Sequence, residues 1–551
     1  MGTPLGHRRC TARVALGACL SLVVLGLPAT PRAQQTGPPG TSYSPDVVRF
    51  LDQATFGPTR ELVEYVQQVG VPAYLAEQLV AQMKPYPDLP PMPATRPADC
   101  TGSCQRDNYT MYPLQVHFFQ NALYGTDQLR QRVAFALGQI FVVSANGSRV
   151  TLSGWMGPYQ QLLYRSAFGN FRQLLTDVTL SPAMGAYLDM VNNRKFNPTT
   201  GVKPNENFSR ELLQLFSIGL VMLNRDGTPQ RDGEGRTIPT YDQAIVENFS
   251  RVFTGWTFAP AFAPGVPNYR DPMVVRVVRR VEVDHDTDEK QLLNGAVNPA
   301  GLSAAADLQA ALDNIFYHPN VGPFIGKQLI QHLVTSNPSP GYVDRIASVF
   351  NDNGFGVRGD LAAVVTAILT DPEARGDQRT DSDYGHLVEP VLFVTRVLRA
   401  FQPQSDGVLA SFTASMGQDV FRAPSVFNFY PPGYRIVGTG LLGPEFKLLD
   451  SATALARINF VNTVVFNGIA AAPPNRPSGT TIDLSPLLPL APDPDALVAA
   501  IDDLLLHRSM SPQMRSTIVE AVAVIPASNR LLRAKTAAYL VASSSQYQVE
   551  R

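Results

Sequence analysis

One five-residue motif occurs twice in this chain, and each copy lies in an amphipathic segment. Glu-Asn-Phe-Ser-Arg spans residues 206–210 and recurs at residues 247–251. In the first segment, apolar side chains recur at helical spacing on one flank, while charged and amide side chains occupy the other. Asn205 and Gly219 suit the start and the end of such a helix. Since the apolar positions of the two copies coincide, both segments are predicted to be helices whose apolar side faces a core.

Helical periodicity continues through most of the remaining sequence. The proline-rich stretch 84–99 reads as an extended connection between helices. Residues 274–283 alternate valines with charged side chains, which predicts a half-buried strand with Val277 and Val281 on its apolar face. The predicted fold class is therefore mainly α: a multi-helix orthogonal array with a small β-hairpin or sheet excursion near residues 220–285.

The first 33 residues have the pattern of a signal peptide. A basic stretch, 7–13, precedes an apolar stretch, 14–27, and small residues offer a cleavage point near Ala33. The apolar stretch is too short to span a bilayer, and no later segment is long and apolar enough to do so. Two alternatives stay open, a twin-arginine signal at Arg8-Arg9 and a lipoprotein cleavage box ending at Cys19. The protein is expected to be exported to the periplasm or the extracellular space.

Length and charge limit the remaining possibilities. The chain is longer than one compact core usually holds, so subdomains are expected. The net charge of −1 gives no reason to expect a nucleic acid as a partner. The predicted parts are a signal peptide (1–33), a linker (34–45), a main helical domain (46–466), a proline-rich linker (473–494) and a C-terminal helical tail (495–545).

Signal cleavage would leave two cysteines, Cys100 and Cys104. In an oxidising compartment this pair is expected to close a small disulfide loop. A redox role fits less well because three residues separate the cysteines instead of two, and a metal site would need more ligands than this pair supplies.

The densest group of ionisable side chains follows the predicted strand. His285, Asp286 and Lys290 lie within a seven-residue acidic stretch, 284–290. Asp286 could orient His285 as a base, or the two side chains could hold a divalent cation. The alternative is a solvated acidic turn.

The polar flank of the repeated helix is the second candidate. Glu206 and Glu211 could supply carboxylates for acid–base work, while Asn207 and Arg210 could bind a substrate. The alternative is a solvated helix face, because Glu206 and Arg210 have the spacing of a surface ion pair. Sharper signatures are missing from the sequence: there is no nucleophile elbow, phosphate-binding loop, zinc-protease helix, dinucleotide fingerprint or haem motif.

Taken together, several stretches resemble one bacterial family of exported proteins, catalogued as domain of unknown function 1800. The similarity covers roughly residues 48–460, and its motifs are those at 50–59, 205–219, 253–257, 285–290 and 318–329. The resemblance implies an exported, largely helical protein, often encoded beside an alkaline-phosphatase-like or sulfatase-like protein. It implies no established reaction.

The chain departs from the family pattern at one place. Where many members look as though they carry Trp-His-Asn-His-Phe, residues 137–141 read Leu-Gly-Gln-Ile-Phe. If those histidines bind a metal in relatives, this chain has lost them, and any metal chemistry must use His285 or another set.

Two hypotheses follow. The first is a hydrolase-like enzyme that acts on an envelope or extracellular polymer, with a divalent metal as an optional cofactor. Its predicted catalytic residues are His285, Asp286, Glu206 and Glu211, and its predicted substrate-binding residues are Asn207, Arg210 and Lys290. The second is a non-catalytic helical scaffold that serves a partner protein, such as the co-encoded phosphatase-like or sulfatase-like protein, or an envelope polysaccharide. The first hypothesis requires the predicted catalytic residues to converge on one pocket.

Overall fold

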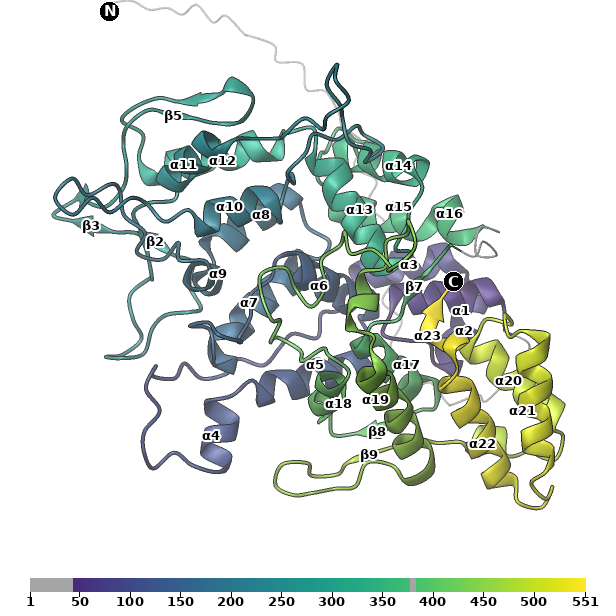
Figure 1. Ribbon diagram of the computed structural model, residues 1–551. Helices are drawn as coiled ribbons and strands as arrows, with labels where there is room; N and C mark the ends of the chain where they lie inside the picture. The colour runs from purple at the N-terminus through teal and green to yellow at the C-terminus, as the bar shows by residue number, and fades with distance from the viewer. Residues whose placement is uncertain (1–42, 377–382) are drawn as a thin grey trace, which may run out of the picture. The chain divides into compact units, whose positions relative to one another are not determined.

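The computed structural model describes residues 43–376 and 383–551 (Figure 1). The predicted signal peptide and most of the predicted linker that follows it lie outside the described residues. No helix in the described part of the chain is long and apolar enough to cross a bilayer.

Helices dominate the described residues, and the strands are short. The helices are α1 (Pro45–Ala54), α2 (Arg60–Val69), α3 (Val71–Val80), α4 (Ser103–Asn108), α5 (Tyr112–Tyr124), α6 (Gln128–Ile140), α7 (Ser153–Ser166), α8 (Phe171–Leu180), α9 (Pro182–Tyr187), α10 (Asn207–Gln214), α11 (Gln243–Val252), α12 (Ala304–Phe316), α13 (Val321–Leu333), α14 (Pro340–Asn351), α15 (Leu361–Thr370), α16 (Pro372–Arg375), α17 (Pro390–Ala400), α18 (Ala410–Ser415), α19 (Ser451–Asn462), α20 (Pro494–Leu505), α21 (Pro512–Ala523), α22 (Arg530–Ala542) and α23 (Ser545–Gln548).

The strands form antiparallel pairs: β1 (Trp256–Thr257) with β2 (Val274–Val275), β3 (Val277–Val278) with β4 (Val281–Glu282), β5 (Lys290–Gln291) with β6 (Val297–Asn298), β7 (His386–Leu387) with β10 (Val549–Glu550), and β8 (Gln404–Ser405) with β9 (Thr480–Thr481). The prediction of a mainly α fold with small hairpin excursions is confirmed.

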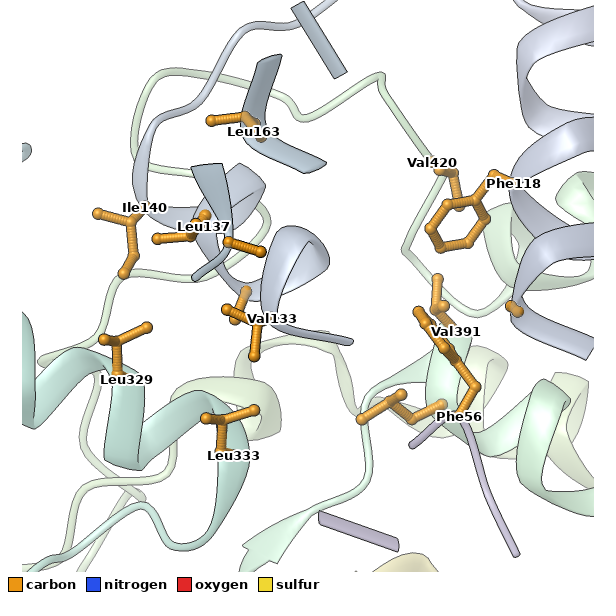
Figure 2. Packing of buried hydrophobic residues seen from close by; sticks show 14 of the residues in the cluster. Phe56, Phe118, Val133, Leu137, Ile140, Leu163, Leu329, Leu333, Val391 and Val420 are labelled. Atoms are coloured by element: carbon orange, nitrogen blue, oxygen red, sulfur yellow. The ribbon is translucent and has the colours of Figure 1, made fainter. Parts of the chain in front are cut away.

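Helix α6 lies in the interior, as its apolar sequence indicates. Figure 2 shows Val133, Leu137 and Ile140 on the side of α6 that faces Leu329 and Leu333 of α13. All five side chains are at most 3% exposed. Burying a side chain of this size contributes about 2 kcal/mol relative to leaving it in water. The contact between α6 and α13 is therefore a strong constraint on the middle of the chain.

The repeated motif forms two helices that pack on each other. The rings of Phe208 in α10 and Phe253, just after α11, meet edge to face at 5.0 Å. Asp242 caps α11 by accepting a hydrogen bond from the N–H of Ile245. Gly219 has a φ of +73°, and a Cβ there would lie 2.7 Å from the Phe324 ring, so glycine suits this chain reversal.

The predicted half-buried strand at 274–283 is wrong in detail. The chain turns back at Arg279 and Arg280, so β3 and β4 form their own hairpin and β2 pairs with β1 instead. Both arginines have positive φ, +51° and +70°, which is typical of a two-residue type I′ turn. Left-handed backbone costs a residue with a Cβ about 1 kcal/mol. Because no layer formed by the described residues covers this ribbon, Val277 and Val281 are 53% and 61% exposed instead of buried.

A disulfide closes one short loop, and long-range contacts hold the C-terminal part of the chain. Cys100 and Cys104 form the expected disulfide, with a Cα–Cα distance of 5.2 Å. Apolar residues of α20 to α22 belong to the same hydrophobic cluster as those of α1 and α6. Strand β10 pairs with β7, and Glu550 places Oε2 3.1 Å from Nε2 of His386.

Candidate functional site

His285, predicted to be a base or a metal ligand, is enclosed in the interior. Its side chain is 0% exposed, with Nδ1 3.1 Å from the carbonyl oxygen of Thr254 and Nε2 3.3 Å from Oδ2 of Asp307. Lys290 places Nζ 2.7 Å from the same Asp307 oxygen. Burial alone would raise the pKa of Asp307, but contacts with His285, Lys290 and Asn298 outweigh burial and lower it. These groups form a closed ionic cluster, here called the Asp307 cluster, which fixes β5 onto α12.

Asp286 is held by a different partner. Its two carboxylate oxygens accept hydrogen bonds from Nε and Nη2 of Arg251, both at 3.0 Å. Burial would raise the pKa of Asp286, but the hydrogen bonds and the charge of Arg251 outweigh burial and lower it. The carboxylate beside the His285 ring is that of Asp307. Asp286 therefore anchors its loop to α11.

The polar flank of α10 is divided between ion pairing and burial. Glu206 accepts hydrogen bonds from Arg210 at 2.8 Å and from Gln243 at 2.9 Å. The side chains of Glu206 and Arg210 are both partly exposed. The backbone N–H of Asn207 donates to the side chain of Asn205. Glu211 is 8% exposed, and burial raises its pKa even though Arg210 opposes this. Glu211 is the predicted catalytic residue on this flank whose charge is least compensated.

The predicted catalytic residues belong to two separate groups. Gln243, which contacts Glu206, begins α11, whereas Arg251, which contacts Asp286, lies eight residues later on the same helix. At 1.5 Å per residue, these anchor points are about 12 Å apart along the helix axis. The structure brings His285, Asp286 and Lys290 together, and Glu206 together with Arg210, but at opposite ends of α11.

No metal site is visible in the arrangement of potential ligands. Within residues 43–376 and 383–551, no three His, Cys, Asp or Glu side chains are grouped so that they could hold a metal ion. The divalent metal therefore remains a prediction without a defined ligand set.

Two adjoining cavities lie against α6 and the segment 418–445. The first is also lined by residues of α5 and α17, and the second by residues of α13. Each has a volume of about 50 Å³, and Gln139 and Asn428 line both. Figure 2 shows Phe118, Val391 and Val420, which line the first cavity, away from Ile140, which lines the second. The first cavity is lined by aromatic rings, aliphatic groups and carboxamides, with no charged side chain.

A buried polar network forms the wall between the cavities. Gln139 donates from Nε2 to Oε1 of Glu389 at 3.2 Å and accepts at Oε1 from Nδ2 of Asn428 at 3.0 Å. The Tyr430 hydroxyl lies 2.8 Å from Oε2 of Glu389, and Gln418 also donates to that oxygen. Burial raises the pKa of Tyr430 well above its usual range, so the hydroxyl keeps its proton. Three side-chain donors thus hold the Glu389 carboxylate in one position.

Glu445 in the wall of the second cavity is the most perturbed carboxyl group of this region. It is 4% exposed, and burial raises its pKa to about 7, with the charge of Glu389 adding to the rise and that of His386 opposing it. The Ser336 hydroxyl donates to Oε2 of Glu445 at 3.4 Å. His332 lines the same cavity, and burial lowers its pKa to about 3, so the ring is neutral. A carboxyl group with a near-neutral pKa beside a cavity suits acid–base chemistry.

The departure from the family pattern falls at this wall. Gly138 lines the first cavity and Ile140 the second. Gln139 lies between them and makes the polar contacts of the wall. The stretch 137–141 therefore shapes both cavities.

Fold and site together define a mainly α protein with two adjoining, partly open cavities and a buried carboxylate in the wall between them. Comparisons with curated proteins and with solved structures find no match. A family model does match: residues 49–549 correspond to the family described as "Protein of unknown function (DUF1800)". The chain belongs to this family, as the resemblance predicted, and the match includes the C-terminal helices.

The sequence did not single out Glu389, Tyr430 or Glu445. Glu389 reads as the first residue of a helix, and the segment around Tyr430 and Glu445 has no clear periodicity. One signal was available: Gln139 is an amide in the apolar second half of α6. A buried amide needs hydrogen-bond partners, and here those partners form the cavity wall.

Proposed function

We propose that this protein is a hydrolase-like enzyme that acts on an uncharged polymer of the envelope or the extracellular space, with the two cavities as its active site. The observation that carries the proposal is Glu445, a buried carboxyl group with a pKa of about 7 in the wall of a cavity. The predicted signal peptide supports a substrate outside the cytoplasm.

Glu445 would act as the general acid or base. At neutral pH a carboxyl group with this pKa is about half protonated, so it can give a proton to a leaving group or take one from an attacking water. Glu389, Tyr430 and Gln139 would position the substrate, because the hydrogen bonds among them fix their orientation before it arrives.

The lining of the first cavity favours an uncharged polar unit of the substrate. Aromatic rings offer apolar contact, and carboxamides offer both donors and acceptors. A charged unit would be desolvated there without an opposite charge. The second cavity adjoins the first and would hold the neighbouring unit of a chain, which is why a polymer is proposed.

The predicted roles of His285, Asp286, Glu206 and Glu211 compete with this assignment. Among them, Glu211 is the strongest rival because its pKa is raised and its Oε2 has no hydrogen-bond partner. We assign the acid–base role to Glu445 because that residue lines a cavity.

The test is hydrolysis of purified uncharged polymers, with chitin and neutral glucans as the probes and soluble fragments measured by mass spectrometry. Once a substrate is found, Glu445→Gln should lower the rate at least about 100-fold and remove the pH dependence near 7. Glu234→Gln, a matched change at an exposed carboxylate, should leave the rate unchanged.

Two results would overturn the proposal. If no polymer is cleaved at any pH but one is retained by the protein, the non-catalytic scaffold replaces the enzyme. If a polymer is cleaved and Glu211→Gln abolishes the rate while Glu445→Gln does not, the chemistry lies on α10.

A further inference from the structure

The β3–β4 hairpin carries an unusual combination of free charge and exposed aliphatic surface. Its turn consists of Arg279 and Arg280, and Val278 and Val281 form the cross-strand pair beside that turn. We propose that this hairpin docks the protein on an anionic phospholipid surface. The inference concerns a surface outside the two cavities and does not depend on the proposed reaction.

Among the described residues, the side chains of the turn have no charged partner. Arg279 and Arg280 are exposed and form no hydrogen bond or ion pair with any residue of the described chain through their side chains. In contrast, the acidic residues of the hairpin are engaged: Asp284 pairs with Arg276 at 2.8 Å, and Glu282 accepts from the backbone N–H of Ala304. The turn therefore presents two guanidinium groups to an outside partner.

The positive surface extends beyond the turn. The backbone N–H of Lys195 donates to the carbonyl oxygen of Asp284 at 2.8 Å, which places segment 194–195 beside the hairpin. Lys195 is exposed, and Arg194 lies 3.7 Å from Asp284. Across 194–195 and 274–284, basic side chains outnumber acidic ones five to two. This local excess contrasts with a net charge of −1 for the whole chain.

The exposed valines distinguish a lipid surface from a soluble polyanion. Val277, Val278 and Val281 are 53%, 46% and 61% exposed, and Figure 1 shows β3 at the outer edge of the β2–β5 region, away from α10 and α11. Guanidinium groups suit phosphates of lipid headgroups, and aliphatic side chains suit the boundary between headgroups and acyl chains. A soluble polyanion would use the arginines but would gain little from the valines.

The backbone of the turn supports a role for the arginines themselves. A type I′ turn favours Asn-Gly, because both central residues need a positive φ. This chain has arginine at both positions, at φ values of +51° and +70°. The turn therefore has two charged residues at positions where the backbone favours asparagine and glycine.

The test is co-sedimentation with vesicles of phosphatidylcholine alone or mixed with phosphatidylglycerol. The wild-type protein should bind the anionic vesicles, and binding should weaken as salt is added. The double variant Arg279→Asn/Arg280→Gly keeps a sequence that suits the turn and removes both charges. It should bind about 25-fold more weakly, at about fivefold per arginine.

Two further variants complete the design. The wild type and all variants are made with the same N-terminal sequence so that only the named substitutions differ. Arg165→Gln/Arg530→Gln removes two exposed arginines elsewhere and should bind like the wild type. Val277→Thr/Val281→Thr keeps β-branched side chains in both strands and should weaken vesicle binding. The proposal fails if the wild type does not prefer anionic vesicles, or if the turn variant binds no more weakly than the Arg165/Arg530 control. It also fails if the valine variant keeps full binding while soluble heparin competes, because the partner is then a polyanion.

Discussion

The Asp307 cluster and the cavity wall at Glu445 both concentrate buried ionisable groups, but they differ in how fully the charges are compensated. Asp307 faces Lys290 and His285, and its pKa is lowered. Burial raises the pKa of Glu445 to about 7, because the charge of His386 and the hydroxyl of Ser336 offset it only in part, and Glu445 lines a cavity. The comparison teaches that a dense ionic group can be purely structural, whereas a carboxyl group with incomplete compensation beside open space is suited to chemistry.

The largest effect is expected from removing the central charge of the Asp307 cluster. Asp307→Asn leaves the ammonium group of Lys290, which is 1% exposed, without its closest carboxylate. Uncompensated buried charges are costly, so the free energy of unfolding in urea should fall by about 3 kcal/mol or more. The matched control is Asp313→Asn on the same helix, where an exposed carboxylate pairs with Arg172; its cost should stay below about 1 kcal/mol. If Asp307→Asn and Asp313→Asn lower the free energy of unfolding equally, the Asp307 cluster has no special structural role.

A smaller, pH-dependent effect is expected at the cavity wall. The pKa of Glu445 in the folded protein is about 7, above the ordinary value of 4.5, so the folded state binds more protons between these pH values. Its contribution to stability is therefore complete below pH 4.5 and is lost as the pH rises through 7. The free energy of unfolding should fall by about 3 kcal/mol across this window.

Glu445→Gln should remove that fall, because glutamine does not titrate. The measurement is urea unfolding of the wild type and the variant at several pH values, and the difference between the two curves isolates Glu445 from other groups. Glu234→Gln, at an exposed position, should follow the wild-type curve. Parallel curves for the wild type and Glu445→Gln would mean that the carboxyl group is not perturbed.

The smallest effect is expected on the exposed flank of α10. Arg210→Gln breaks the ion pair with Glu206, in which both side chains are partly exposed. Such a pair four residues apart on a helix contributes about 0.5 kcal/mol or less, measured by thermal or urea unfolding. A cost above about 1 kcal/mol would instead place this pair among the structural clusters.

Much of the fold could be predicted because its signals are local. The apolar spacing in 206–219, the cap at Asp242 and the short loop between Cys100 and Cys104 each involve residues a few positions apart. The strand prediction at 274–283 failed for a related reason. Alternation alone does not reveal where a chain reverses, and two arginines are not a usual signal for a type I′ turn.

The candidate site could be predicted only in part. The sequence indicated that His285, Asp286 and Lys290 are neighbours, but not that they are enclosed and that their central carboxylate is Asp307. It also indicated that residues 137–141 are unusual. Nothing local showed that the Tyr430 hydroxyl would meet Gln139, which is 291 positions away in the sequence.

By itself the sequence determined a mainly α protein of the DUF1800 family with one small disulfide loop, because helical periodicity, caps and ordered motifs are short-range properties. Only the tertiary structure decided which carboxyl groups are neutralised and which one lines a cavity. The pKa of a carboxyl group depends on burial and on charges brought close in space. For Glu445, burial and the charge of Glu389 raise the pKa, while His386 and Ser336 oppose the rise. These residues come close to Glu445 only after folding.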